Sequence, residues 1–316
     1  MGFFNTAPGR FVLLGIGVLV ISTAAPLIKS LPHVPSLVIA ASRLTLAACI
    51  LVPIGWRQRQ TNLHALTTRD IIIVIAAGVC LALHFATWIA SLRYTSVASS
   101  VVLVTLNPLL LALASYVIWG ERLSRSLAIG IGLGMLGSVC IAWNDFRGLS
   151  VYANDQNDQA VFGDFLALCG AVLMSAYLLC GRLVRAHISL SIYVGLVYAC
   201  AAFLLVTACF ILDLPFSGYS GHTYLLLALL GLGPQLIGHT ILNWALAYVS
   251  PTVVALAILG EPVGASILAW FFLGEAVSWL QVLGGLLILS GIILGRSQES
   301  DQSDKSDKPD KDGGFS

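Results

Sequence analysis

Polar side chains stand at helical spacing inside runs of apolar residues. Gln235, His239 and Asn243 follow one another at intervals of four, so on a helix they would share one face. Glu261 interrupts the apolar stretch "ILGEPVGASILAWFFLGE" and is followed directly by Pro262, which removes a backbone donor. Side chains of these types can bind a small molecule by hydrogen bonds or exchange protons with it, and we expect them to line a site.

A second candidate face lies earlier in the chain, where His84, Trp88 and Ser91 recur at i, i+4 and i+7. We expect Trp88 and Trp244 to offer aromatic contact to a bound molecule, but Trp244 also suits an aromatic belt at a membrane surface. A single histidine on an apolar helix is commonly a hydrogen-bonded core residue, and this alternative stays open for His84 and His239.

The ionisable residues inside the apolar runs have both structural and functional interpretations. The Glu261 carboxylate could bind the backbone that Pro262 leaves unpaired, or it could contact a substrate and couple its movement to protons. Arg43 could extend its charged end to a membrane surface or pair with Glu261. Glu121 and Glu275 stand at the ends of apolar runs, and we expect them to be structural, near the positive end of the next helix.

The composition identifies lipid as the surroundings of these residues. Of the 316 residues, 58% are hydrophobic and 10% are charged, whereas a soluble domain carries roughly 25% charged residues. The net charge of +1 gives no indication of nucleic-acid binding, and we expect no nucleic-acid partner. The seven cysteines form no CxxC pair, so we expect packed core residues and neither a metal site nor a cofactor.

Ten apolar runs are long enough to cross a bilayer, which takes roughly 20 residues. The first run could instead be a signal peptide, but its length and the span that follows at once favour a retained helix. The sequence therefore predicts an all-α integral membrane protein with ten transmembrane helices. Their cores are expected near 11–30, 36–55, 70–91, 96–119, 126–143, 162–181, 190–212, 223–246, 251–273 and 278–295.

Positive charges give the orientation of the chain. If the N-terminus is cytoplasmic, the inside holds most of the arginines and the lysines of the tail, whereas the outside holds only Lys29, Arg93 and Arg147. We therefore expect a multi-pass protein of the cell membrane, the inner membrane in a bacterium, with both termini in the cytoplasm.

The two halves of the chain repeat at an offset of 154 residues (262 − 108), which places Pro262 on Pro108 and Glu261 on Asn107. We expect both prolines to break or hinge their helices. Each half would hold five spans, an odd number, so the copies would be inverted, as in secondary transporters with a site near the midplane. The offset also aligns Tyr94 with Tyr248, Ser96 with Ser250, Gly120 with Gly274, Glu121 with Glu275, Ser124 with Ser278, Gly130 with Gly284 and Gly137 with Gly291.

The segments "YTSVASSVVLVTLNPLLLALASYVIWGERLS" and "YVSPTVVALAILGEPVGASILAWFFLGEAVS" resemble the signature region of EamA-type carriers of the drug/metabolite transporter superfamily. The arginine of "AASRLTLAAC" also fits, and the resemblance covers about residues 11–295. It implies ten helices as two inverted five-helix repeats, a cavity lined by spans 1, 3, 4, 6, 8 and 9, and export or exchange of small metabolites. Pro251 and Thr252 depart from the small residues of the first copy, which implies a more kinked turn there.

The domain organisation follows from the repeat. Residues 1–145 would form the first repeat, 146–161 an extracytoplasmic connector, 162–296 the second repeat and 297–316 a disordered cytoplasmic tail rich in Ser, Asp and Lys. The spacings Gly130-x-x-x-Gly134 and Gly291-x-x-x-Gly295 let helices approach closely, so spans 5 and 10 could pack within the protein or form a homodimer.

These observations predict a secondary transporter of small organic metabolites, and no enzyme, that works by alternating access. The sequence has no GxxxxGK[ST] motif for ATP and no HExxH motif. A lining of Trp, His, Gln and Asn with few charges suits neutral or zwitterionic cargo such as amino acids. Protons are the candidate coupling ion. An uncoupled facilitator stays open, and a membrane sensor or intramembrane enzyme is the less favoured alternative.

Overall fold

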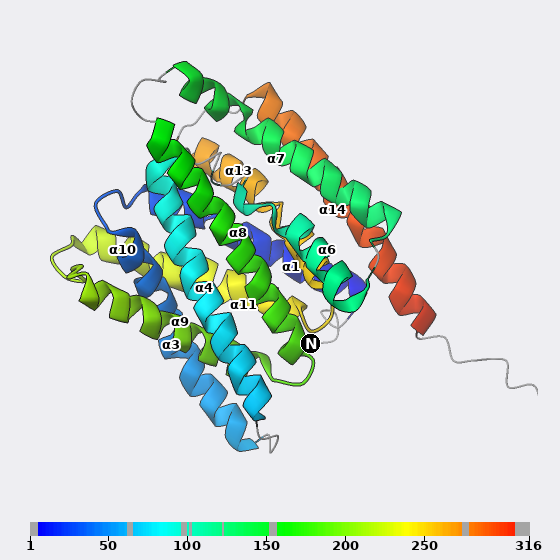
Figure 1. Cartoon of the computed structure of the whole chain (residues 1–316), viewed down its shortest axis with the longest axis horizontal. Coiled ribbons are helices and arrows are strands. Elements are labelled where there is room, and N and C mark those ends of the chain that lie inside the picture. The colour runs from blue at the N-terminus through cyan, green and yellow to red at the C-terminus, as the bar shows by residue number, and fades with distance from the viewer. Residues whose placement is uncertain are drawn as a thin grey trace, which may run out of the picture.

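The computed structural model describes residues 6–61, 66–95, 100, 103–121, 123–151, 157–273 and 278–306, and its regular elements are all helices (Figure 1). No strand occurs within these ranges. The elements are α1 (Ala7–Ile21), α2 (Ala24–Lys29), α3 (Ser36–Thr61), α4 (Thr68–Tyr94), α6 (Asn107–Trp119), α7 (Arg125–Val151), α8 (Asn157–Arg185), α9 (Leu190–Ile211), α10 (Gly221–Leu230), η2 (Gly231–His239), α11 (Thr240–Ala245), α12 (Pro251–Ile258), α13 (Glu261–Leu273) and α14 (Trp279–Ser306).

Seven helical segments of the described chain are long and apolar enough to cross a membrane, and three shorter apolar helices accompany them. The shorter ones, Asn107–Trp119, Arg125–Cys140 and Trp279–Gly295, coincide with the fourth, fifth and tenth expected spans. The chain is therefore an all-helical, multi-pass membrane protein, and the arrangement of ten inverted spans stays a prediction. The seven long segments are Pro8–Lys29, Ser36–Arg57, Thr68–Tyr94, Val161–Arg185, Leu190–Ile211, Gly221–Ala245 and Pro251–Leu268.

Three of the apolar segments are broken near their middle. α1 gives way to α2 at Ser22–Thr23, a turn at Thr105–Leu106 precedes α6, and a turn at Leu259–Gly260 separates α12 from α13. Each break lies within four residues before a proline, which cannot donate the backbone hydrogen bond that a continuing helix requires. These prolines are Pro26, Pro108 and Pro262.

A fourth segment changes its winding instead of breaking. Between α10 and α11 the chain forms the π-helix η2, which contains Pro234. A π-helix bonds each residue to the fifth along, so side chains four apart no longer lie above one another as they do on an α-helix. Gln235 and His239 lie within η2 and Asn243 follows in α11, and all three side chains are buried.

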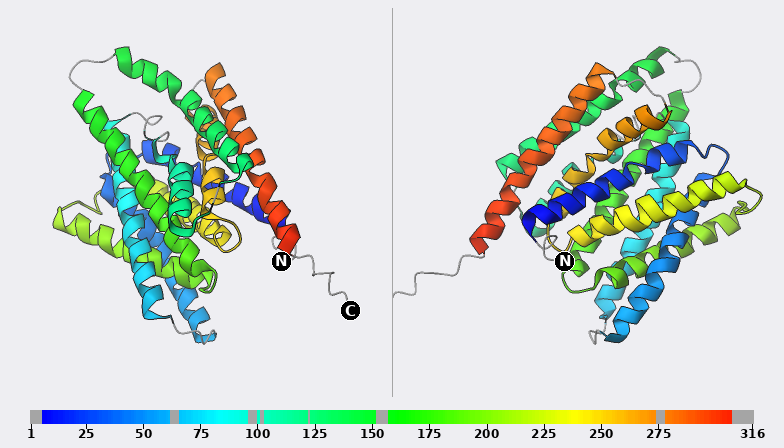
Figure 2. Two further views of the ribbon diagram at one scale, coloured as in Figure 1. Left: turned by 45° about the vertical axis from the view of Figure 1, so that its right-hand side comes forward. Right: turned by 180° about the vertical axis from the view of Figure 1, so that it is seen from behind.

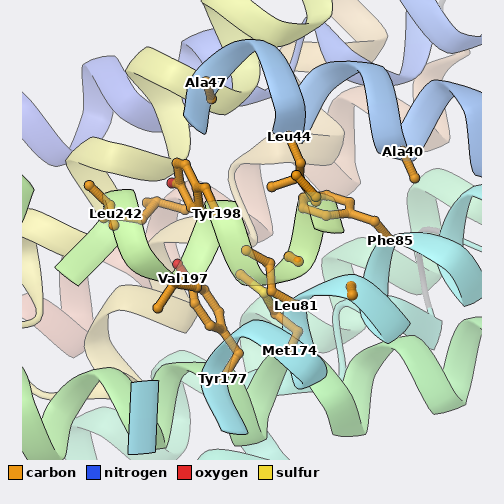
Figure 3. Close-up of a cluster of buried hydrophobic side chains, with 14 of the residues drawn as sticks. Ala40, Leu44, Ala47, Leu81, Phe85, Met174, Tyr177, Val197, Tyr198 and Leu242 are labelled. Carbon is orange, nitrogen blue, oxygen red and sulfur yellow. The ribbon is translucent and has the colours of Figure 1, made fainter. Parts of the chain in front are cut away.

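The long helices pair side by side in a bundle (Figure 2). α3 packs along α9, α4 along α8 and α7 along α14, while α1 lies against η2. Figure 3 shows the centre of the core, where Leu44, Leu81, Phe85, Met174 and Tyr198 come together from four different helices and are all buried. This packed centre holds the broken segments in place around the site described below.

The α7–α14 pair meets through glycines. A methyl group built on Gly130 would lie only 2.6 Å from the carbonyl oxygen of Gly291, so any side chain there would push the two helices apart. The close approach permitted by these small residues is therefore made within one chain. A homodimer through the same residues stays an untested prediction.

Replacing Gly291 by leucine should lower the free energy of unfolding by about 1–3 kcal/mol, because the added side chain overpacks the contact with α7. Gly132→Leu is the matched control on α7, since a Cβ at Gly132 would meet no described atom within 4 Å. The midpoints of thermal unfolding in detergent compare the two variants. Equal losses would contradict this account of the contact.

Helices continue into segments that we expected to be irregular. α14 extends through residues 297–306, which were expected to belong to a disordered tail, and α7 and α8 enter the expected connector from both sides. A helix that is already nucleated adds residues at little cost, even where the sequence is polar. Residues 307–316, the connector centre 152–156, Ser96 and Glu275 lie outside the described residues.

Candidate functional site

A small pocket lies at the level of the three helix breaks. Its volume is about 40 Å³, which leaves room for a water molecule or two. Its walls come from α1, α2, α3, α4, α8, η2, α11, α12 and α13 and from the start of α6. The lining residues are Ile21, Ala24, Arg43, His84, Phe85, Trp88, Val104, Thr105, Asn107, Met174, His239, Leu242, Ile258 and Glu261.

Five side chains that the sequence singled out line this pocket, namely Glu261, Asn107, His84, Trp88 and His239. They are supplied by α13, α6, α4 and η2, which are far apart in the chain. The fold therefore brings the carboxylate together with members of both expected polar faces.

Arg43 lies in the pocket wall. The interpretation in which its charged end extends to a membrane surface is therefore wrong. Its side chain is 0% exposed, and its Nε donates a hydrogen bond to Oε1 of Gln235 at 3.0 Å. The guanidinium carbon lies 4.1 Å from the centroid of the Phe85 ring, which is within range of a cation–π interaction. Within the described residues, the Arg43 guanidinium is therefore a fully buried cation in the pocket wall.

Glu261 and Asn107 occupy equivalent places in two half-helices. Glu261 is the first residue of α13, directly after the break at Leu259–Gly260, and Asn107 is the first residue of α6 after Thr105–Leu106. The start of a helix carries a partial positive charge and unpaired N–H groups, which favour a carboxylate or an amide oxygen. Glu261 also interacts electrostatically with Arg43 across the pocket.

The two histidines of the pocket are held in different ways. His84 Nδ1 lies 2.9 Å from the carbonyl oxygen of Gly170, and because a carbonyl only accepts, Nδ1 carries the proton. The His84 ring stacks on Trp88 with centroids 6.1 Å apart. His239 meets the Phe85 ring edge-on at 5.3 Å. The rings of Trp88 and Phe85 therefore contact the two histidines within the pocket lining.

Three other expected site residues lie outside the pocket lining. Gln235 accepts the hydrogen bond from Nε of Arg43. The side-chain amide of Asn243 donates to the His239 carbonyl at 2.7 Å and to the Tyr177 hydroxyl. Trp244 packs on Tyr248 with ring centroids 4.9 Å apart. Gln235 and Asn243 are therefore bonded to two lining residues, Arg43 and His239, without lining the pocket themselves.

Sequence reasoning left Arg43, Phe85 and Met174 out of the expected site, although all three line the pocket. The signal for Arg43 was present, because a single arginine within an apolar run needs a partner at that depth. Phe85 and Met174 carry no such signal among the many apolar residues of the chain.

Two larger cavities lie beyond the pocket, one towards each end of the bundle. One holds about 680 Å³ and is lined by residues that include Glu121, Arg182 and Leu246, and the other holds about 330 Å³ and is lined by Ile28, Arg93 and others. About one helical turn separates the pocket from each cavity. On one side Leu242 lines the pocket and Leu246 lines the larger cavity. On the other side Ala24 lines the pocket and Ile28 lines the smaller cavity. Thin layers of side chains therefore separate the pocket from both cavities.

An ion pair lies at the rim of the larger cavity. Arg182 of α8 donates a hydrogen bond to Glu121 at 2.8 Å, and its guanidinium lies 4.4 Å from the ring centroid of Trp119. Glu121 directly follows Gly120, the left-handed cap of α6, so the pair ties the end of α6 to α8. The hydrogen bond from Arg182 holds the pKa of Glu121 below its usual value.

We expect a small, pH-dependent contribution of this pair to stability. Because the pKa of Glu121 is lower in the folded protein, the contribution is present above the unfolded value of roughly 4.3 and is lost as the pH falls through the folded value. Glu121→Gln should therefore unfold slightly earlier than the wild type at pH 7, and the two midpoints should converge below about pH 4. A difference between the midpoints that persists at low pH would contradict the role of this pair.

Comparison with known proteins finds the same family twice along the chain. The model of the EamA-like transporter family matches residues 10–143 and 161–295. A transporter of Clostridium kluyveri, described as uncharacterized, is 24% identical over 259 residues, which are 80% of each chain. The crystal structure of another protein superposes with a TM-score of 0.74 at 22% identity, over 92% of this chain and 98% of its own, which is a likeness of fold.

Proposed function

The chain belongs to the EamA-like transporter family, and from this membership we propose that it is a secondary transporter of small organic metabolites that works by alternating access. One observation carries the proposal. A small pocket lined from both halves of the chain lies about one helical turn from a larger cavity on each side. Movement of either thin layer would open the pocket to one side while the other stays closed.

The pairing of the helices supports two inverted repeats of five spans. If the halves are exchanged by the offset of 154 residues, the pair α4–α8 becomes the pair of η2 with α1, and the pairs α3–α9 and α7–α14 map onto themselves. Two copies related by a two-fold axis would produce this pattern. The two separate matches to one family model are in accord with it.

The broken segments supply the parts that alternating access requires. Secondary transporters commonly place half-helix ends at their substrate sites, because free backbone groups there can bind cargo and the breaks can bend. Here α6 and α13 both begin at the pocket, with Pro108 and Pro262 directly after Asn107 and Glu261. We therefore propose the two breaks as hinges.

The charge distribution supports a cell-membrane protein with both termini in the cytoplasm. The larger cavity lies at the bundle end that carries Arg182 and Arg125, so it would face the cytoplasm. Export or exchange is the direction that the family resemblance favours.

The pocket lining supports cargo that is neutral or zwitterionic, because it mixes aromatic rings with single groups of each charge. Protons are the proposed coupling ion, since Glu261 is a carboxylate in the pocket. A facilitator without ion coupling is the alternative within the same fold, and a sensor or an intramembrane enzyme is the alternative outside transport.

Counterflow into liposomes that contain only the purified protein tests the proposal. Vesicles loaded with a panel of unlabelled amino acids, nucleosides, sugars and amines should take up at least one of the labelled compounds faster than protein-free vesicles. Unloaded vesicles under an imposed proton gradient then separate the two kinds of carrier. A coupled carrier accumulates the compound until the gradient is dissipated, whereas a facilitator only equilibrates it. No uptake of any compound would overturn the transporter assignment.

A further inference from the structure

The pocket contains a buried cation whose hydrogen-bonding capacity is only partly used. Arg43 is fully buried, and its Nε is bound to Gln235. Within the described part of the chain, its Nη1 and Nη2 atoms have no hydrogen-bond partner. A guanidinium offers a planar fork of N–H groups that matches the two oxygens of a carboxylate. Buried donors without partners are costly, so a ligand that supplies acceptors here would gain that energy on binding.

Glu261 gives the same pocket an opposite charge. It lies at the start of α13, whereas Arg43 lies on α3, and the two interact electrostatically. The pocket therefore has little net charge but a pronounced dipole, positive at α3 and negative at α13. A cargo that carries no net charge and a matching dipole would fit it without burying an unpaired ion.

Two further polar atoms complete this arrangement. The indole nitrogen of Trp88 is a buried donor and Oδ1 of Asn107 is a buried acceptor, and neither has a hydrogen-bond partner among the residues described. Both side chains line the pocket. The donors Arg43 and Trp88 and the acceptors Glu261 and Asn107 thus form two sets of groups, which suit the two ends of one small molecule.

We propose that Arg43 binds the carboxylate of a compact zwitterionic cargo through Nη1 and Nη2, while Glu261 receives its ammonium group. This rests on the proposed transport function and assigns the recognition residues of that site. In the empty carrier the two charges serve as counter-ions for each other, and the cargo enters between them when the movement of a thin layer widens the pocket. Gln235 is a positioning residue, because its hydrogen bond to Nε fixes the orientation of the Arg43 guanidinium, which lines the pocket.

The charge pair discriminates between cargo types. A carboxylic acid without an amino group would leave Glu261 facing a second negative charge, and an amine without a carboxylate would place a second cation near Arg43. An uncharged sugar or nucleoside would leave both charges without full hydrogen bonding. Selectivity for the zwitterion therefore follows from the pocket itself.

Competition in the counterflow assay tests this proposal on the wild-type protein. The panel holds the twenty L-amino acids, and for the best of them its methyl ester, its N-acetyl derivative and the corresponding amine, together with glucose and uridine. The free amino acid should be exchanged at least about tenfold faster than the three derivatives, which each lack one charge. Equal exchange of the amino acid and its ester, or exchange of glucose or uridine in place of every amino acid, would overturn the proposal and leave the transporter assignment intact. No exchange of any compound would overturn the transporter assignment itself.

Substitution of Arg43 separates recognition from a merely structural role. Arg43→Gln should abolish the preference for the amino acid over its ester, and Arg43→Lys, which keeps the charge but loses the fork, should raise KM about tenfold at similar kcat. Arg57→Gln is the matched control, because Arg57 is an exposed arginine on the same helix, and its preference should equal that of the wild type. An Arg43→Gln protein that retains the wild-type preference would overturn the role of Arg43. If that variant does not fold, the KM of Arg43→Lys decides, and an unchanged KM would overturn it.

Discussion

Transport by a Glu261→Gln variant should fall by at least about tenfold, which corresponds to roughly 1.4 kcal/mol, while the protein still inserts into the membrane. Glutamine keeps the shape of the side chain at the start of α13 but removes the charge that faces Arg43. The variant can neither carry a proton nor balance the buried guanidinium. Counterflow of the best panel compound in proteoliposomes measures the loss.

Glu121→Gln is the matched control for this experiment. Glu121 is also a glutamate beside a helix end and also interacts with an arginine, but its side chain is 44% exposed at the bundle end. Its replacement should leave the counterflow rate within about twofold of the wild type. Wild-type transport by Glu261→Gln would show that the pocket carboxylate has a structural role only.

The second large effect is on stability. Arg185→Met should lower the free energy of unfolding by about 2–5 kcal/mol, because it leaves two buried carbonyl groups without a donor. Arg185 is 6% exposed, and its guanidinium donates to the carbonyl of Asn243 at 3.0 Å and to that of Ile188. Arg185 therefore links α8 to α11, the helix that directly follows the π-helix carrying His239.

Arg182→Met is the control on the same helix, three residues earlier. Its partner Glu121 is exposed, so the loss should be only about 0–1 kcal/mol. Thermal unfolding midpoints of both variants in one detergent make the comparison. Similar losses for the two variants would contradict the structural role assigned to Arg185.

The sequence predicted most of the helical segments and five of the residues that line the pocket. Apolar runs of sufficient length indicated helices, and the prolines together with the offset of 154 residues pointed to Asn107 and Glu261 as equivalent positions. The structure places both residues at half-helix starts in the pocket. Their meeting with His84 and Trp88 could be expected only from the resemblance to a known family.

Other features depend on contacts that no local pattern contains. The partner of Arg43 lies 192 residues away on η2, so the sequence alone left open whether this arginine faced lipid or protein. The π-helical winding of η2, which contains Gln235 and His239, also leaves no signal in the 3.6-residue period of the sequence. The continuation of α14 past the apolar run was not predicted. The polar composition of the tail indicates that it is not buried, but it does not show whether an existing helix extends into it.

Labelling of a cysteine in the pocket tests the central claim most directly. In a variant whose seven native cysteines are replaced by serine or alanine, Ala24→Cys places one thiol in the pocket wall, and Ala40→Cys places one in the packed core of α3 as a control. A membrane-impermeant thiol reagent is added to one side of sealed vesicles of known orientation, and then to the other. Alternating access predicts that Cys at position 24 reacts from both sides while the membrane stays impermeable, and that Cys at position 40 reacts from neither. Reaction at position 24 from one side only, or from neither, would contradict the account.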